Sequence, residues 1–151
     1  MKWLVLATAS VLTACAGQNT DDAALEQERL KAQANAVFET VEKHAQCAGF
    51  HRAHAELASG DKSKAAYYTA AAANAEIAAT EIATKELQKD LAVEMVTKIA
   101  DTQAAEWAFA IKSQDKQQIV MSQTETCDAL AEEQKEFARD IVKAKYGFKK
   151  E

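Results

Sequence analysis

No proline occurs in the 151 residues and glycine occurs only four times, so few positions can interrupt a helix. Alanine, which has the highest helix propensity, fills 34 positions. The sequence therefore predicts an all-α fold and excludes a β-rich one. Each buried alanine removes little apolar surface from water, so the core of such a fold must be thin.

The N-terminal residues have the pattern of an export signal. Lys2 is followed by an apolar stretch, Trp3 to Leu12, which is shorter than the ~20 residues needed to span a bilayer. The next residues, Leu12-Thr13-Ala14-Cys15, resemble the lipobox of bacterial lipoproteins, in which an apolar residue and two small ones precede an invariant cysteine. The resemblance covers only this signal.

The lipobox resemblance implies that Cys15 receives a diacylglyceryl group and becomes the first residue of the mature chain. On this interpretation residues 1–14 are a signal peptide, residues 15–22 a lipidated tether and residues 23–148 a helical bundle domain. The resemblance also implies that Ala16, in a Gram-negative host, directs the anchor to the periplasmic side of the outer membrane. An alternative is an ordinary signal peptide cut after Ala16, which would leave a soluble periplasmic protein.

On this interpretation the three cysteines have two different roles. If Cys15 carries lipid, Cys47 and Cys127 remain as a pair in an oxidising compartment. We therefore expect a disulfide between Cys47 and Cys127.

Two short turns with similar sequences, Ser59–Lys62 and Ser113–Lys116, separate three predicted helical stretches. The stretches cover about 22–58, 61–112 and 117–146. In the last stretch, apolar residues recur at spacings of three and four, and Cys127 lies in that row. Cys47 occupies an equivalent position in the first stretch. Both cysteines should therefore point inward.

The middle stretch, residues 61–112, must fold back on itself if the two cysteines are to meet. As one straight helix it would be roughly 75 Å long and would hold them about 35 to 40 Å apart. A disulfide requires Cα atoms within about 7 Å. A break near Leu87 to Asp90, with Asp90 as N-cap, gives an up-down-up-down four-helix bundle in which the first and last helices are neighbours. The alternative is an extended three-helix hairpin with unpaired or intermolecular cysteines.

All three histidines, His44, His51 and His54, lie on one face of the first stretch, beside Cys47. Imidazole and thiolate bind zinc or copper, so one interpretation is a metal site. The simpler interpretation is that the histidines are hydrogen-bonded or partly exposed residues of the helix packing, because a disulfide would consume the only available thiol. We therefore expect no cofactor, with a zinc or copper site as the alternative.

Familiar catalytic motifs are absent from the sequence. It contains no nucleophile elbow, phosphate-binding glycine loop, haem-attachment motif or zinc-protease motif. A net charge of −5 argues against nucleic acid as a partner. The sequence predicts a lipid-anchored, non-enzymatic envelope protein that faces the periplasm and binds another, unidentified protein. Alternatives are a metal-binding or small-molecule-binding bundle using His51 and His54, and a phage-derived exclusion or immunity lipoprotein.

Overall fold

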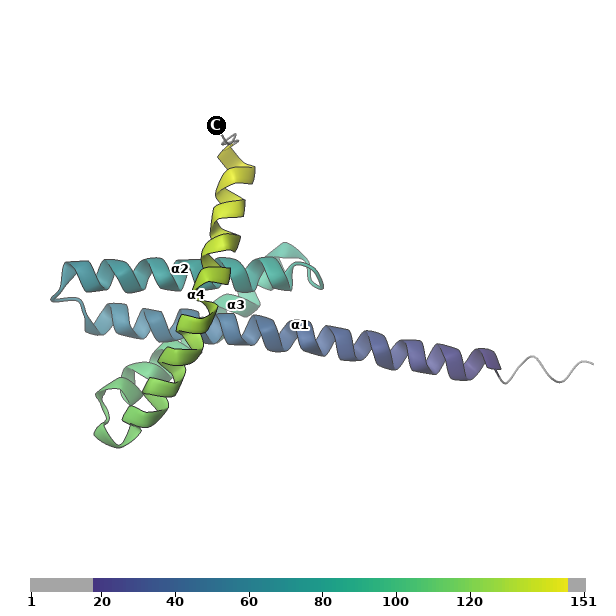
Figure 1. Ribbon diagram of the computed structural model, residues 1–151, viewed down its shortest axis with the longest axis horizontal. Helices are drawn as coiled ribbons and strands as arrows, with labels where there is room; N and C mark the ends of the chain where they lie inside the picture. Colours follow the sequence, from purple (N-terminus) through teal and green to yellow (C-terminus); the bar gives the residue numbers. More distant parts are fainter. Residues whose placement is uncertain (1–17, 147–151) are drawn as a thin grey trace, which may run out of the picture. The chain divides into compact units, whose positions relative to one another are not determined.

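The computed structural model describes the backbone of residues 18–146, and the described residues form an all-α bundle of four helices, as predicted. The order of the elements is visible in Figure 1. They are α1 (Gln18–Leu57), α2 (Lys62–Ala83), α3 (Lys89–Lys112), the short 3₁₀ helix η1 (Gln114–Lys116) and α4 (Gln117–Tyr146). None of the described helices is long and apolar enough to cross a membrane.

The chain divides into two compact units, residues 1–35 and residues 36–151. The described part of the first unit, residues 18–35, belongs to the N-terminal half of α1, and its side chains from 24 to 33 are all exposed. The second unit contains the rest of α1 together with α2, α3, η1 and α4.

The chain reverses direction between α1 and α2 and again between α2 and α3. At the first reversal Asp61 is the N-cap of α2, and its side chain accepts hydrogen bonds of 3.1 Å from the backbone N–H groups of Ser63 and Lys64. The second reversal lies at residues 84–88. The prediction that Asp90 is the N-cap of α3 was wrong, because Gln88 occupies that position. Asp90 lies instead in the first turn, where a carboxylate also complements the helix dipole.

The C-terminal part of α1 is the central helix of the bundle. From His44 to Ala53, every residue is buried except Gln46 and Arg52, which are partly buried. A helix buried on all sides needs neighbours on all sides, and Figure 1 shows α4 crossing the hairpin of α1 and α2 while α3 lies behind it. The face that carries Cys47 and the three histidines is therefore only part of the buried surface of this helix.

Gly49 allows α1 and α3 to approach unusually closely. A Cβ atom built on Gly49 would lie 2.5 Å from the Cβ of Gln103, 2.6 Å from the carbonyl oxygen of Ala100 and 2.9 Å from the backbone nitrogen of Ala104. Two of these three atoms belong to the backbone of α3, so the neighbour has little freedom to move. Any larger residue at position 49 would force the two helices apart.

The core is thin, as the alanine content predicted. Most of its fully buried residues are alanines, and the large fully buried apolar side chains are those of Phe50, Val41 and Val96. One apolar cluster surrounds the cysteines and includes Phe50, and a second includes Val41 and Val96. With so little apolar volume, we expect covalent and polar contacts between helices to carry an unusual share of the stability.

Candidate functional site

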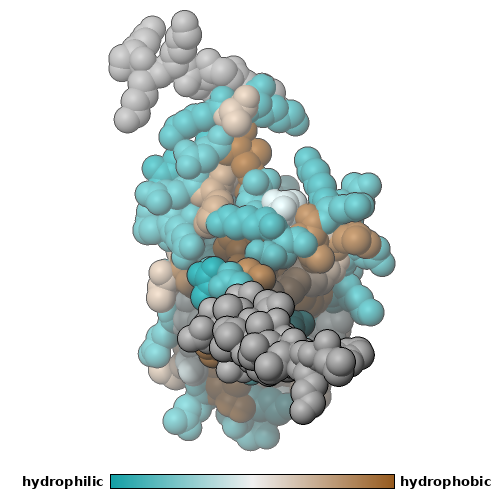
Figure 2. All heavy atoms as spheres, turned by 90° about the vertical axis from the view of Figure 1, so that its right-hand side faces the viewer, coloured by the Kyte–Doolittle hydropathy of each residue, from teal (hydrophilic) through white to brown (hydrophobic). Residues whose placement is uncertain are grey.

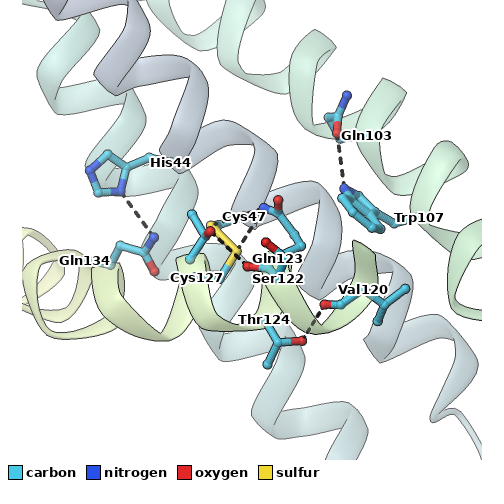
Figure 3. Close-up of a disulfide and its surroundings, with 11 residues drawn as sticks. His44, Cys47, Gln103, Trp107, Val120, Ser122, Gln123, Thr124, Cys127 and Gln134 are labelled. Carbon is cyan, nitrogen blue, oxygen red and sulfur yellow. Dashed lines mark hydrogen bonds between the residues drawn. A yellow bond between two sulfur atoms is a disulfide. The ribbon is translucent and has the colours of Figure 1, made fainter. Parts of the chain in front are cut away.

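A disulfide between Cys47 and Cys127 joins α1 to α4, as predicted. The two Cα atoms are 5.4 Å apart, and neither cysteine is exposed. Figure 3 shows Gln123 beside the bridge. Its side-chain nitrogen donates to the sulfur of Cys127 at 3.3 Å and lies 3.8 Å from the sulfur of Cys47. The first and last helices of the bundle are therefore linked at its centre.

His44 is fully buried on the same side of α1 as the disulfide. The side-chain nitrogen of Gln134 donates a hydrogen bond of 3.2 Å to Nδ1 of His44 (Figure 3). The other ring nitrogen, Nε2, has no hydrogen-bond partner, and the nearest carboxylate oxygen is that of Glu133 at 3.9 Å. Burial lowers the pKa of His44, and Glu133 opposes this shift only in part. His44 is thus a neutral core histidine.

His51 and His54 belong to an aromatic cluster toward the α1–α2 turn. The His54 ring stacks on Tyr68 with a centroid distance of 4.7 Å and an interplanar angle of 21°. Phe50 meets His54 edge to face at 4.6 Å and Trp107 at 5.2 Å. Because these rings come from α1, α2 and α3, the cluster packs three helices together.

His51 is only 6% exposed, and its Nδ1 atom is buried without a hydrogen-bond partner. Burial, followed by repulsion from His54, lowers the pKa of His51 to about 4, while Asp128 acts in the opposite direction. Burial also lowers the pKa of His54. All three histidines are therefore neutral in the folded protein at neutral pH.

The three predicted ligand residues share a helix face without forming a metal centre. His44 contacts Gln134, whereas His51 and His54 contact aromatic rings, and Cys47 is consumed by the disulfide. Within the part of the chain that the structure describes, no three His, Cys, Asp or Glu side chains are grouped so that they could hold a metal ion. The arrangement favours packing and hydrogen bonding over metal coordination.

Acidification should destabilise the protein through these histidines. His51 titrates near pH 6.5 when unfolded and near 4 when folded, so the unfolded state binds more protons as the pH falls below 6.5. A difference of this size is worth about 2 kcal/mol of lost stability by pH 5 and about 3.4 kcal/mol below pH 4. We expect the free energy of unfolding, measured with urea, to be lower at pH 5 than at pH 7 by at least about 2 kcal/mol.

The variant His51→Gln isolates this effect, because glutamine retains hydrogen-bonding groups but does not titrate. Its unfolding free energy should fall by about 2 kcal/mol less between pH 7 and pH 5 than that of the unsubstituted chain. Equal losses in the two proteins would contradict the assignment of His51 as a buried neutral histidine.

Two polar residues important to the site were not recognised as such from the sequence. Gln134 interrupts the apolar row of α4 and turns out to be the partner of His44. Arg52 lies between two carboxylates, binding Glu76 of α2 at 2.6 Å and also Asp101 of α3. Their partners are at least 24 residues away in the sequence, so no local pattern could have identified these contacts.

The predicted lipidation site cannot be compared with this geometry, because Cys15 and the predicted signal peptide lie outside the described residues. Comparisons of the chain with protein-family models, with curated proteins and with solved structures found no match.

Proposed function

We propose that this chain is a lipid-anchored, non-enzymatic envelope protein that faces the periplasm from the outer membrane and acts by binding another protein. The observation that carries the proposal is the Cys47–Cys127 disulfide. Disulfides persist in oxidising compartments, which fits an exported protein. The pairing leaves Cys15, within the lipobox-like sequence, as the one cysteine available for a lipid.

The role in protein binding is supported by apolar side chains exposed near the α3–α4 connection. Phe109 on α3 is 65% exposed, and Ile119 and Met121 on α4 are 59% and 64% exposed. Lys116 lies 4.9 Å from the centroid of the Phe109 ring. Figure 2 shows apolar patches in brown among the hydrophilic side chains that are visible in that view. Exposed large apolar residues are the usual anchors of protein interfaces.

One experiment tests both the anchor and the partner. A photo-cross-linking amino acid at Ile119 should yield a discrete adduct with another protein in the membrane fraction of intact cells. The same substitution combined with Cys15→Ala should leave the chain in the soluble fraction, because the acyl anchor is lost. The adduct should then be strongly reduced, because the chain is no longer held at the membrane beside its partner.

The matched control places the cross-linker at Glu125, an exposed polar position on the same helix. It should give no comparable adduct. A Cys15→Ala chain that remains membrane-bound would contradict the anchor, and equal adducts from positions 119 and 125 would contradict the interface.

A further inference from the structure

A partly enclosed cavity of about 200 Å³ lies between α1, α2 and α4. Ala70 and Ala71 of α2 and Ala131 of α4 line it, and their small side chains leave the space open. Polar side chains from all three helices complete the lining, among them His51 of α1 and Asn74 of α2. The cavity is the size of a small organic molecule and combines an apolar wall with convergent polar groups, as ligand sites do.

Two of the polar groups that line the cavity are almost completely buried. His51 is 6% exposed and has a ring nitrogen without a hydrogen-bond partner, and Gln134 is 2% exposed. The side-chain nitrogen of Gln134 is used by His44, and its carbonyl oxygen points away from His44 in Figure 3. That oxygen remains an acceptor for a donor other than His44. A bound hydrogen-bond donor would therefore find an acceptor in that oxygen.

Two exposed side chains of opposite charge, Lys135 and Asp128, line the cavity. Lys135 lines it, but its ammonium group is already paired with Glu132 at 2.6 Å. Asp128 also lines it, and within the described residues no ion pair involves its carboxylate. The adjacent His51 is neutral and therefore does not compensate that charge. The aromatic ring of Tyr67, also in the lining, attracts cations through its face.

We propose that this cavity binds the protonated amino group of a small organic amine. The ammonium group pairs with the carboxylate of Asp128 and donates to the carbonyl oxygen of Gln134, while its carbon chain packs against the alanines of α2 and α4. An ammonium supplies donors for the oxygen of Gln134 and a positive charge for the carboxylate of Asp128. A metal ion is a poorer match, because the described residues offer it no group of three ligands.

Titration of the purified chain with n-butylammonium, followed by NMR of the histidine rings, tests the proposal. The His51 resonances should shift with a Kd in the range of about 1 to 10 mM. His54, which does not line the cavity, should shift much less. Butyrate, with a similar carbon chain and the opposite charge, should produce no saturable shift of His51.

Three variants separate specific binding from general attraction to an acidic protein. Asp128→Asn should weaken n-butylammonium binding at least tenfold, whereas Glu125→Gln, which removes the same charge elsewhere on α4, should leave the Kd within twofold. Ala131→Leu should abolish binding by filling the cavity while keeping its charged groups. No saturable shift of His51, or a Kd that Asp128→Asn and Ala131→Leu leave unchanged, would overturn the proposal.

Discussion

Replacing both Cys47 and Cys127 with alanine should lower the free energy of unfolding by about 4.5 kcal/mol at 25 °C. The disulfide closes a loop with a sequence separation of 80 residues, and the crosslink removes that loop's entropy from the unfolded chain. Domains of this size are stabilised by only about 5 to 15 kcal/mol in total. Because the core is largely alanine, the double variant should have few other contacts to compensate for the loss.

Guanidinium unfolding of both proteins under non-reducing conditions measures this difference. Reducing the unsubstituted chain should produce a comparable loss, which controls for the small cavity left by removing sulfur. Cys15→Ala should leave the unfolding free energy of the bundle unchanged, because that residue does not take part in the disulfide. A loss below about 1 kcal/mol in the double variant would contradict the stabilising role of the bridge.

The substitution Gly49→Ala should destabilise the protein by about 3 kcal/mol, against the usual effect of this change in a helix. In an isolated helix, alanine is more favourable than glycine by about 1 kcal/mol. Here the added methyl group would collide with the backbone of α3 at Ala100 and Ala104. Helix α3 would have to move away from α1, which would loosen the packing around Phe50. Thermal or denaturant unfolding of the variant measures the sign as well as the size of the effect.

Gly60→Ala is the matched control for this prediction. Gly60 is exposed in the α1–α2 turn, and a Cβ built there would meet no atom within 4 Å. Its replacement should change the unfolding free energy by no more than about 0.5 kcal/mol. If Gly49→Ala proved as stable as Gly60→Ala, α1 and α3 would not be in the close contact described here.

The sequence allowed the helical fold, the number of helices and the disulfide to be predicted. The absence of proline and the high alanine content favour helix at each position, so the helices could be predicted without knowing any tertiary contact. The fold-back between α2 and α3 was inferred from a distance constraint, because a straight helix would have kept Cys47 and Cys127 apart. The exact position of this turn was harder to predict, since residues 84–88 contain neither glycine nor proline.

The central position of α1 could not be predicted in the same way. The spacing of its larger residues indicates one buried face, whereas its other buried positions are filled by Ala45, Ala48, Gly49 and Ala53. Small residues of this kind give no periodic hydrophobic signal, because alanine and glycine occur equally on exposed helix faces. Their burial follows from the close approach of the neighbouring helices, α2 as well as α3, which depends on the whole fold.

The side chains that contact the three histidines could not be predicted, for a related reason. In the sequence, Gln134 is a polar residue within an apolar row, and only the position of His44 on another helix explains it. Similarly, the sequence groups His44, His51 and His54 on one face, but in the structure His44 pairs with Gln134, whereas His51 and His54 stack on Tyr68. Spacing along one helix predicts which residues are near each other, while the chemistry depends on what the neighbouring helices supply.

Intact-mass spectrometry of the chain extracted from cell membranes, with thiols alkylated under non-reducing conditions, tests the disulfide and the lipid anchor together. We predict no alkylated cysteine, a mature chain that begins at Cys15 with a mass increase corresponding to acylation, and two alkylations after reduction, at Cys47 and Cys127. A chain with free thiols at Cys47 and Cys127, or one without an acylated Cys15, would contradict the account of a disulfide-closed bundle held by a lipid anchor.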